Sequence, residues 1–97
     1  MTELFELLQQ QKAGIVAIAQ RYHATNIRVF GSVVRGDNHD GSDIDLLVYF
    51  LPGTTLLDQV GLINALSTAL GRKVDIVSER ALNKHLRQQV LQEAVSL

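Results

Sequence analysis

Residues 28–50 read RVFGSVVRGDNHDGSDIDLLVYF, and this stretch decides the fold. Two apolar runs, residues 27–30 and 44–50, flank a polar segment that contains three glycines. Side chains alternate between the two faces of a strand, so Asp43 and Asp45 are expected to point the same way, roughly 6 to 7 Å apart. Two like charges held that close beside an apolar run are unfavourable unless a cation lies between them. A hard divalent cation, which prefers carboxylate oxygens as ligands, meets that condition.

The composition limits the class of protein. The chain has 97 residues, 46% of them apolar, with one proline and no cysteine. We expect a single domain over residues 1–97 with one compact core and no disulfide or cysteine-type zinc site. The net charge of −1 gives no reason to expect direct binding to nucleic acid or to a membrane surface. The N-terminus resembles no signal peptide and no apolar run reaches the length of about 18 residues that a membrane span needs, so a cytoplasmic protein is expected.

Apolar periodicity outside the central stretch predicts three helices. Residues 2–23 carry apolar side chains at three-and-four spacing, with Gln11 as the one polar interruption, and predict one helix followed by a turn at residues 24–26. Thr55 and Asp58 predict a capping box for a second helix that ends before Gly71. The predicted buried face of this second helix consists of Leu57, Val60, Ile63, Leu66, Ala69 and Leu70. The last helix begins at Leu82 or Asn83, and its predicted buried face consists of Leu86, Val90 and Ala94.

A third strand is predicted at residues 74–77, and the element order is then α-β-β-α-β-α. This order predicts an α/β (α+β) domain in which helices pack on a small mixed sheet of about three strands. The helix between the second and third strands implies a crossover connection with those two strands parallel. About a dozen polar residues join the first two strands, and a connection of that length in a compact domain is usually functional or disordered.

Carboxylates recur where the sequence otherwise predicts buried strands. Asp75 lies inside the apolar run VDIV, just as Asp45 lies at the start of IDLLV. Because aspartate is depleted in strands, a merely solvated position is the weaker interpretation of both residues. If the two strands are neighbours, Asp43, Asp45 and Asp75 converge on a divalent-metal site suited to phosphoryl or nucleotidyl transfer.

The dipeptide Gly31-Ser32 follows directly on the first predicted strand. A glycine there lets the backbone approach a ligand closely, and the following amides and the serine hydroxyl can hold phosphate oxygens. A helical turn over residues 32–35 would add to the affinity for an anion. Taken alone, the same dipeptide is also compatible with an ordinary turn glycine and a capping serine.

Together, these features resemble the signature of the minimal nucleotidyltransferase (MNT) family within the polymerase-beta-like nucleotidyltransferase superfamily. The pattern is Gly-Ser, ten residues and Asp-x-Asp, with Arg-Gly inside the gap, a serine before the first aspartate and one more acidic residue in a later strand. The matching positions are Gly31, Ser32, Arg35, Gly36, Ser42, Asp43, Asp45 and Asp75. The resemblance implies the polymerase-beta-like fold, two Mg²⁺ ions and ATP as the donor. It also implies that Asp43 and Asp45 hold both metal ions and that Asp75 completes the catalytic site that activates the nucleophile.

The resemblance assigns the remaining positions to the nucleotide. The Gly31-Ser32 turn would position the β- and γ-phosphates, and Ser42 would contact the nucleotide or shape the turn before the carboxylates. Arg35 would either neutralise the triphosphate or pair with a nearby aspartate, Asp37 or Asp40. The base of the nucleotide is not specified by any motif in the sequence.

The acceptor is expected on another molecule, because larger relatives use a second domain for it and this chain has none. MNT proteins are commonly encoded beside a HEPN ribonuclease toxin, and the resemblance implies transfer of AMP to a tyrosine hydroxyl of that toxin, which neutralises it. Two alternatives stay open: a non-catalytic antitoxin that acts by binding alone, and a nucleotidyltransferase subunit with a small-molecule acceptor. A short chain of this kind is compatible with a hetero-complex or a homodimer.

Overall fold

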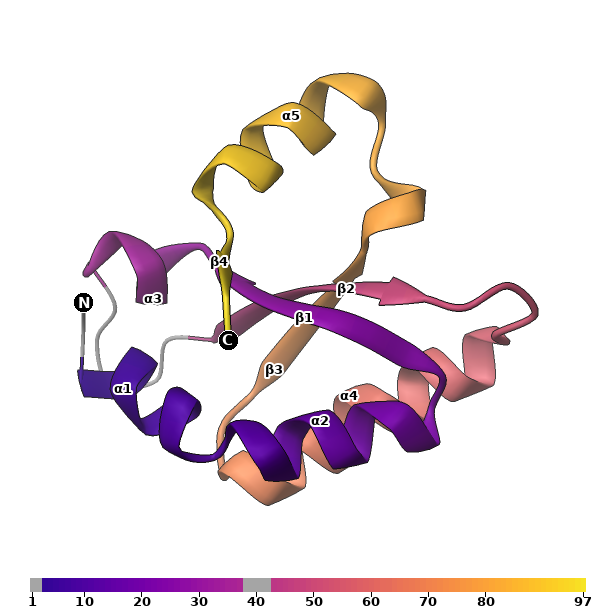
Figure 1. The fold of residues 1–97 in the computed structure, drawn as a ribbon, viewed down its shortest axis with the longest axis horizontal. Coiled ribbons are helices and arrows are strands. Elements are labelled where there is room, and N and C mark those ends of the chain that lie inside the picture. The colour runs from indigo at the N-terminus through magenta and orange to yellow at the C-terminus, as the bar shows by residue number, and fades with distance from the viewer. Residues whose placement is uncertain (1–2, 38–42) are drawn as a thin grey trace.

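A four-stranded mixed sheet organises the chain in a computed structural model that describes residues 3–37 and 43–97 (Figure 1). In chain order the elements are α1 (Glu3–Gln10), α2 (Lys12–Arg21), β1 (Ala24–Phe30), α3 (Ser32–Arg35), β2 (Ile44–Phe50), α4 (Leu56–Leu70), β3 (Val74–Ser78), the 3₁₀ helix η1 (Glu79–Ala81), α5 (Lys84–Glu93) and β4 (Val95–Ser96). The expected α/β class is confirmed. The expected three strands and the order α-β-β-α-β-α are corrected by the additional strand β4, by α3, and by the division of the first helix into α1 and α2.

The strands lie in the order β3-β2-β1-β4. β2 runs parallel to β3, as the predicted crossover through α4 requires, and β1 runs antiparallel to both β2 and β4. β2 has neighbours on both sides, and five of its seven residues are buried. This position explains why its sequence is apolar on both faces after Asp45.

The helices divide unequally between the two faces of the sheet (Figure 1). Helices α1, α2 and α4 cover one face, and the buried apolar core lies between them and the strands. The segment from η1 through α5 passes over the opposite face. Among the described residues, no helix combines the length and the apolar character that a membrane span requires.

The predicted first helix is interrupted at Gln11. The Gln11 N–H donates to the carbonyls of both Leu7 (3.2 Å) and Leu8 (3.1 Å), and the Gln11 carbonyl accepts from Ile15 (3.0 Å) as α2 begins. Gln11 occupies a position that the apolar spacing assigns to the inward face, and burying an unpaired amide is unfavourable. The interruption leaves the Gln11 side chain exposed.

The predicted turn at residues 24–26 is wrong, because these residues form the start of β1. The chain reverses instead at His23, which has a φ of 65°. Asn26 also has a positive φ of 53°, and the pairing of β1 with β2 shifts between Thr25 and Arg28. The polar residues therefore mark a bulged strand, and bulges of this kind increase the local twist.

The predicted ends of α4 are confirmed. The Thr55 hydroxyl accepts from the Asp58 N–H, the Asp58 carboxylate accepts from the Thr55 N–H, each at 3.1 Å, and Gly71 ends the helix with a φ of 64°.

The predicted buried face of α4 is wrong at several positions. Leu57 is 81% exposed and Val60 46% exposed, and Ala69 is also exposed, whereas Leu62 and Leu66 are fully buried. Because the helix carries apolar side chains all round, the spacing alone cannot say which side faces the sheet.

The last helix begins as predicted, with the Asn83 side chain accepting from the Leu86 N–H at 2.9 Å. Its predicted buried face is wrong, since no residue of α5 is buried. Of that predicted face, Leu86 is exposed, Val90 is half-buried and Ala94 lies beyond the end of the helix. The chain leaves the helix at Glu93 because the next residues pair with β1 as β4.

Candidate active site

The predicted Gly31-Ser32 turn is present at the end of β1. Gly31 has a φ of 79°, and its carbonyl accepts from the N–H groups of Val34 and Arg35, each at 3.1 Å. The turn continues into the single helical turn α3, which closes at Gly36 in the left-handed conformation. The helical turn that would add to the affinity for an anion is therefore present over residues 32–35.

Asp45 packs directly against Gly31. Asp45 pairs with Phe30, the residue before the glycine, in the antiparallel ladder of β1 and β2. A Cβ atom on Gly31 would lie 3.2 Å from the Asp45 Cγ and would collide with the Asp45 Oδ2. The missing side chain therefore makes room for the carboxylate and joins the turn and Asp45 into one site.

Asp75 lies beside Asp45 on the neighbouring strand. β2 and β3 are parallel, and Asp45 is in register with Asp75. Since neighbouring strands are about 4.8 Å apart and residues in register project to the same face, the two carboxylates share one side of the sheet. Asp43 comes immediately before β2, and its carboxylate lies 3.6 Å from the Lys73 ammonium. All three carboxylates thus lie where β2 and β3 begin.

The surroundings raise the pKa of Asp45. Partial burial is the largest cause, followed by the negative charges of Asp75 and Asp43. The positive charge of Arg35 acts in the opposite direction, and the negative charge of Glu93 adds to the rise. A cation that binds beside such a carboxyl group stabilises its ionised form.

The donor atoms at the site suit Mg²⁺, which prefers carboxylate oxygens. Within residues 3–37 and 43–97, however, no three His, Cys, Asp or Glu side chains lie close enough together to hold a metal ion. Metal binding by Asp43, Asp45 and Asp75 therefore stays a prediction that rests on donor chemistry and on the electrostatics of Asp45.

Arg35 pairs with two carboxylates. Its Nη1 lies 2.7 Å from the Glu93 Oε1, and its Nε lies 3.3 Å from the Asp37 Oδ2. These hydrogen bonds, that to Glu93 first, raise the pKa of Arg35. Of the two aspartates expected as local partners of Arg35, Asp37 is observed and Asp40 lies outside the described residues. Ser42, the predicted nucleotide contact, also lies outside them. Glu93 was missed because it lies 58 residues further along the chain and no local pattern marks it.

A second ionic cluster fixes η1 against the sheet. The Arg28 side chain is buried in β1, and its Nη2 lies 2.9 Å from the Glu79 Oε2. Arg87 of α5 approaches the other oxygen of Glu79 at 3.6 Å. The hydrogen bond from Arg28 is the main cause that lowers the pKa of Glu79. Sequence reasoning missed this cluster too, since its members come from three separate elements.

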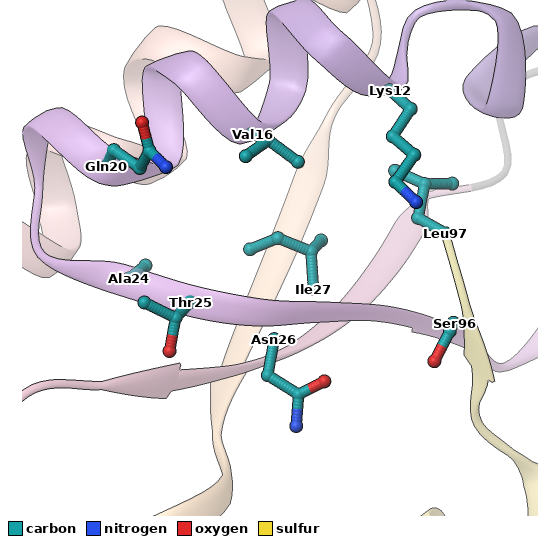
Figure 2. Close-up of a pocket in the computed structure, with 9 residues that line it drawn as sticks. All are labelled: Lys12, Val16, Gln20, Ala24, Thr25, Asn26, Ile27, Ser96 and Leu97. Atoms are coloured by element: carbon teal, nitrogen blue, oxygen red, sulfur yellow. The ribbon is translucent and has the colours of Figure 1, made fainter.

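A cavity of about 300 Å³ lies between α2, β1 and the C-terminal residues of the chain (Figure 2). It is lined by Lys12, Val16, Gln20, Ala24, Thr25, Asn26, Ile27, Ser96 and Leu97. None of the predicted site residues lines it, so this cavity is not part of the candidate active site.

Comparison with known proteins agrees with the fold. Residues 13–97 match the family described as polymerase beta nucleotidyltransferase. The chain is 37% identical over 78 residues to the protein adenylyltransferase MntA of Thermococcus cleftensis, an alignment that covers 80% of this chain and 79% of that protein.

Two solved structures are also similar. One is described as a minimal nucleotidyltransferase, with 49% identity and a TM-score of 0.85 over 95% of this chain and 94% of the other. The other is a toxin–antitoxin crystal structure with AMP-PNP, with 28% identity and a TM-score of 0.75 over 88% of this chain and 70% of the other. The chain belongs to the polymerase beta nucleotidyltransferase family, and the expected fold is confirmed.

Proposed function

We propose that this nucleotidyltransferase is an antitoxin that transfers AMP from ATP to a tyrosine hydroxyl of a HEPN ribonuclease toxin and thereby neutralises it. The observation that carries the proposal is the Gly31-Ser32 turn packed against Asp45, with Asp75 in register beside it. A similar curated protein is a protein adenylyltransferase, and a similar solved structure is a toxin–antitoxin pair with the ATP analogue AMP-PNP.

In the proposed reaction the tyrosine oxygen attacks the α-phosphorus of ATP. A new phosphorus–oxygen bond forms to the tyrosine, the bond to the oxygen that bridges the α- and β-phosphates breaks, pyrophosphate leaves and the phenolic proton passes to water. Asp43, Asp45 and Asp75 would hold two Mg²⁺ ions. When bound, Mg²⁺ would lower the pKa of the attacking hydroxyl and neutralise charge on the leaving pyrophosphate.

The nucleotide is proposed to bind across the turn that follows β1. The Ser32 hydroxyl and the backbone of the Gly31-Ser32 turn would hold the β- and γ-phosphates, and Arg35 would neutralise part of their charge. Ser42 is proposed as a further nucleotide-binding residue.

The test is to incubate the protein with α-labelled ATP, Mg²⁺ and the purified HEPN toxin. Label on a toxin tyrosine is the expected result. Tight binding without transfer would favour the non-catalytic antitoxin, and label on a small molecule would favour the nucleotidyltransferase subunit with a small-molecule acceptor.

Two sets of variants make the test specific. The double variant Asp43→Asn/Asp45→Asn is expected to abolish transfer and Mg²⁺ binding by calorimetry while circular dichroism shows that the fold is kept. Asp58→Asn, which removes a charge from the cap of α4, is the matched control and should transfer normally. Wild-type transfer by the double variant would overturn the assignment of these carboxylates, and wild-type transfer by Asp75→Asn would overturn only the role of Asp75.

A further inference from the structure

We propose that Glu93 belongs to the nucleotide site, where it competes with the triphosphate for Arg35 and so sets the affinity for ATP. The inference rests on the proposed function, since it takes ATP as the donor and Arg35 as a ligand of its phosphates. It adds a residue from the last helix to a site that is otherwise built from β1, α3, β2 and β3.

Glu93 is the principal partner of Arg35. The 2.7 Å contact from Glu93 is shorter than the 3.3 Å contact from Asp37. The Glu93 side chain is also less exposed, at 27% against 62% for Asp37. Because Glu93 is the last residue of α5 and Arg35 the last of α3, this ion pair connects the two helices beside the Gly31-Ser32 turn, the proposed phosphate turn.

The pair lies within electrostatic reach of the catalytic carboxylates. Arg35 ends the helical turn that begins at Ser32, and its N–H donates to the Gly31 carbonyl at 3.1 Å. Asp45 in turn packs against Gly31 at the start of the phosphate turn. A triphosphate bound to that turn would therefore be attracted by the charge of Arg35 and repelled by the charge of Glu93.

The charges explain the competition. In the protein without nucleotide, one guanidinium is faced by two carboxylates, so the group of Arg35, Glu93 and Asp37 is negative and cannot attract an anion. The Nη1 that contacts Glu93 belongs to the fork of donors with which arginine recognises phosphate. A triphosphate that binds through the same Nη1 would therefore compete with Glu93 for Arg35.

Glu93→Gln separates the charge from the shape of the side chain. The amide keeps an oxygen that can accept from Arg35, but its hold on the guanidinium is weaker. We expect Glu93→Gln to bind nucleotide about two- to fivefold more tightly, the range that loss of one exposed competing ion pair corresponds to. The measurement is calorimetric titration, without toxin, of an ATP analogue whose α,β-bridging oxygen is replaced by methylene, which prevents transfer.

The same titration in the Arg35→Gln background decides whether Glu93 acts through Arg35. If it does, Glu93→Gln has no further effect there, whereas a general charge effect would persist and overturn the inference. Weaker or unchanged binding by the single variant Glu93→Gln would also overturn it. Glu6→Gln on α1 is the control for loss of one surface charge and should bind as the wild type does.

These outcomes are separate from the proposed function. Wild-type protein that binds the analogue but never labels the toxin would refute the proposed acceptor, while the effect of Glu93→Gln on nucleotide affinity would still be measured. Wild-type protein that does not bind the analogue at all would overturn the inference.

Discussion

Replacing Gly31 with alanine tests the junction between the Gly31-Ser32 turn and Asp45 of β2. Gly31 has a φ of 79° and a ψ of −152°, a combination that is essentially restricted to glycine and costs other residues about 1–3 kcal/mol. The new Cβ would also lie 3.2 Å from the Asp45 Cγ and would collide with its Oδ2, so the carboxylate must move. Overpacking of this kind costs about 1–3 kcal/mol. We expect the two costs together to lower the free energy of unfolding of Gly31→Ala by about 2–6 kcal/mol.

Gly71→Ala is the matched control. Gly71 also has a positive φ, of 64°, but a Cβ there would meet nothing within 4 Å. Only the cost of a left-handed backbone, about 1–2 kcal/mol, applies there, so the difference between the two variants in urea unfolding reports the contact with Asp45 together with the less tolerant backbone conformation of Gly31.

Transfer of AMP should distinguish the two variants more sharply than stability does. At a temperature where both are folded, Gly31→Ala should lose at least about a hundredfold in transfer rate, since a displacement of about 1 Å at a reacting centre can have that effect. Gly71→Ala should transfer normally. If the two variants lose equal stability and Gly31→Ala keeps its activity, Asp45 does not depend on Gly31 for its position and the site described here is wrong.

Four further substitutions test other features. A Cβ on Gly61 would lie 2.5 Å from the Tyr22 ring, so Gly61→Ala should destabilise the protein by about 1 kcal/mol or more in urea unfolding. A Cβ on Gly14 would meet nothing within 4 Å, so Gly14→Ala should stabilise the protein by about 0.5–1 kcal/mol in the same measurement. Glu79→Gln weakens the pairing of buried Arg28 and should cost about 1–3 kcal/mol at pH 7. Because the pKa of Glu79 is lowered in the folded protein, ionised Glu79 stabilises the fold above its unfolded pKa, and this stabilisation is lost as the pH falls through the folded pKa. If Glu79→Gln were as much less stable than the wild type in acid as at pH 7, this account would be wrong. Because the pKa of Asp45 is raised, its ionisation destabilises the fold increasingly as the pH rises from the unfolded pKa through the folded one. Without metal, Asp45→Asn should therefore have a higher melting temperature than the wild type at pH 7 but not at pH 3. An equal difference in melting temperature at both pH values would refute the electrostatic account.

The central stretch could be predicted because its signals are local. Asp43, Asp45 and the Gly31-Ser32 turn lie within fifteen residues of one another. Strand alternation and the requirement for glycine before α3 act over that same short distance. Asp75 required one step more, the assumption that β2 and β3 are neighbours, and the parallel register confirms that assumption.

The rest of the structure depends on contacts that no local pattern records. The buried side of α4 is decided by the sheet, because Leu57 and Leu62 are equally apolar and only packing determines that one is exposed and the other buried. The ion pairs of Arg28 and Arg35 join residues 51 and 58 positions apart. In the sequence these arginines and their partners look like ordinary surface charges.

The failure of apolar periodicity in α5 has a physical cause. In the proposed function the face of the sheet that carries Asp45 binds a charged nucleotide, and a helix packed on it through apolar side chains would exclude water and phosphate together. α5 is held instead by ion pairs, through Arg87 and Glu79 near its start and through Glu93 and Arg35 at its end. Exposed ion pairs contribute little to stability and exchange partners readily, whereas apolar packing does not. The attachment of α5 through ion pairs therefore suits the proposed chemistry.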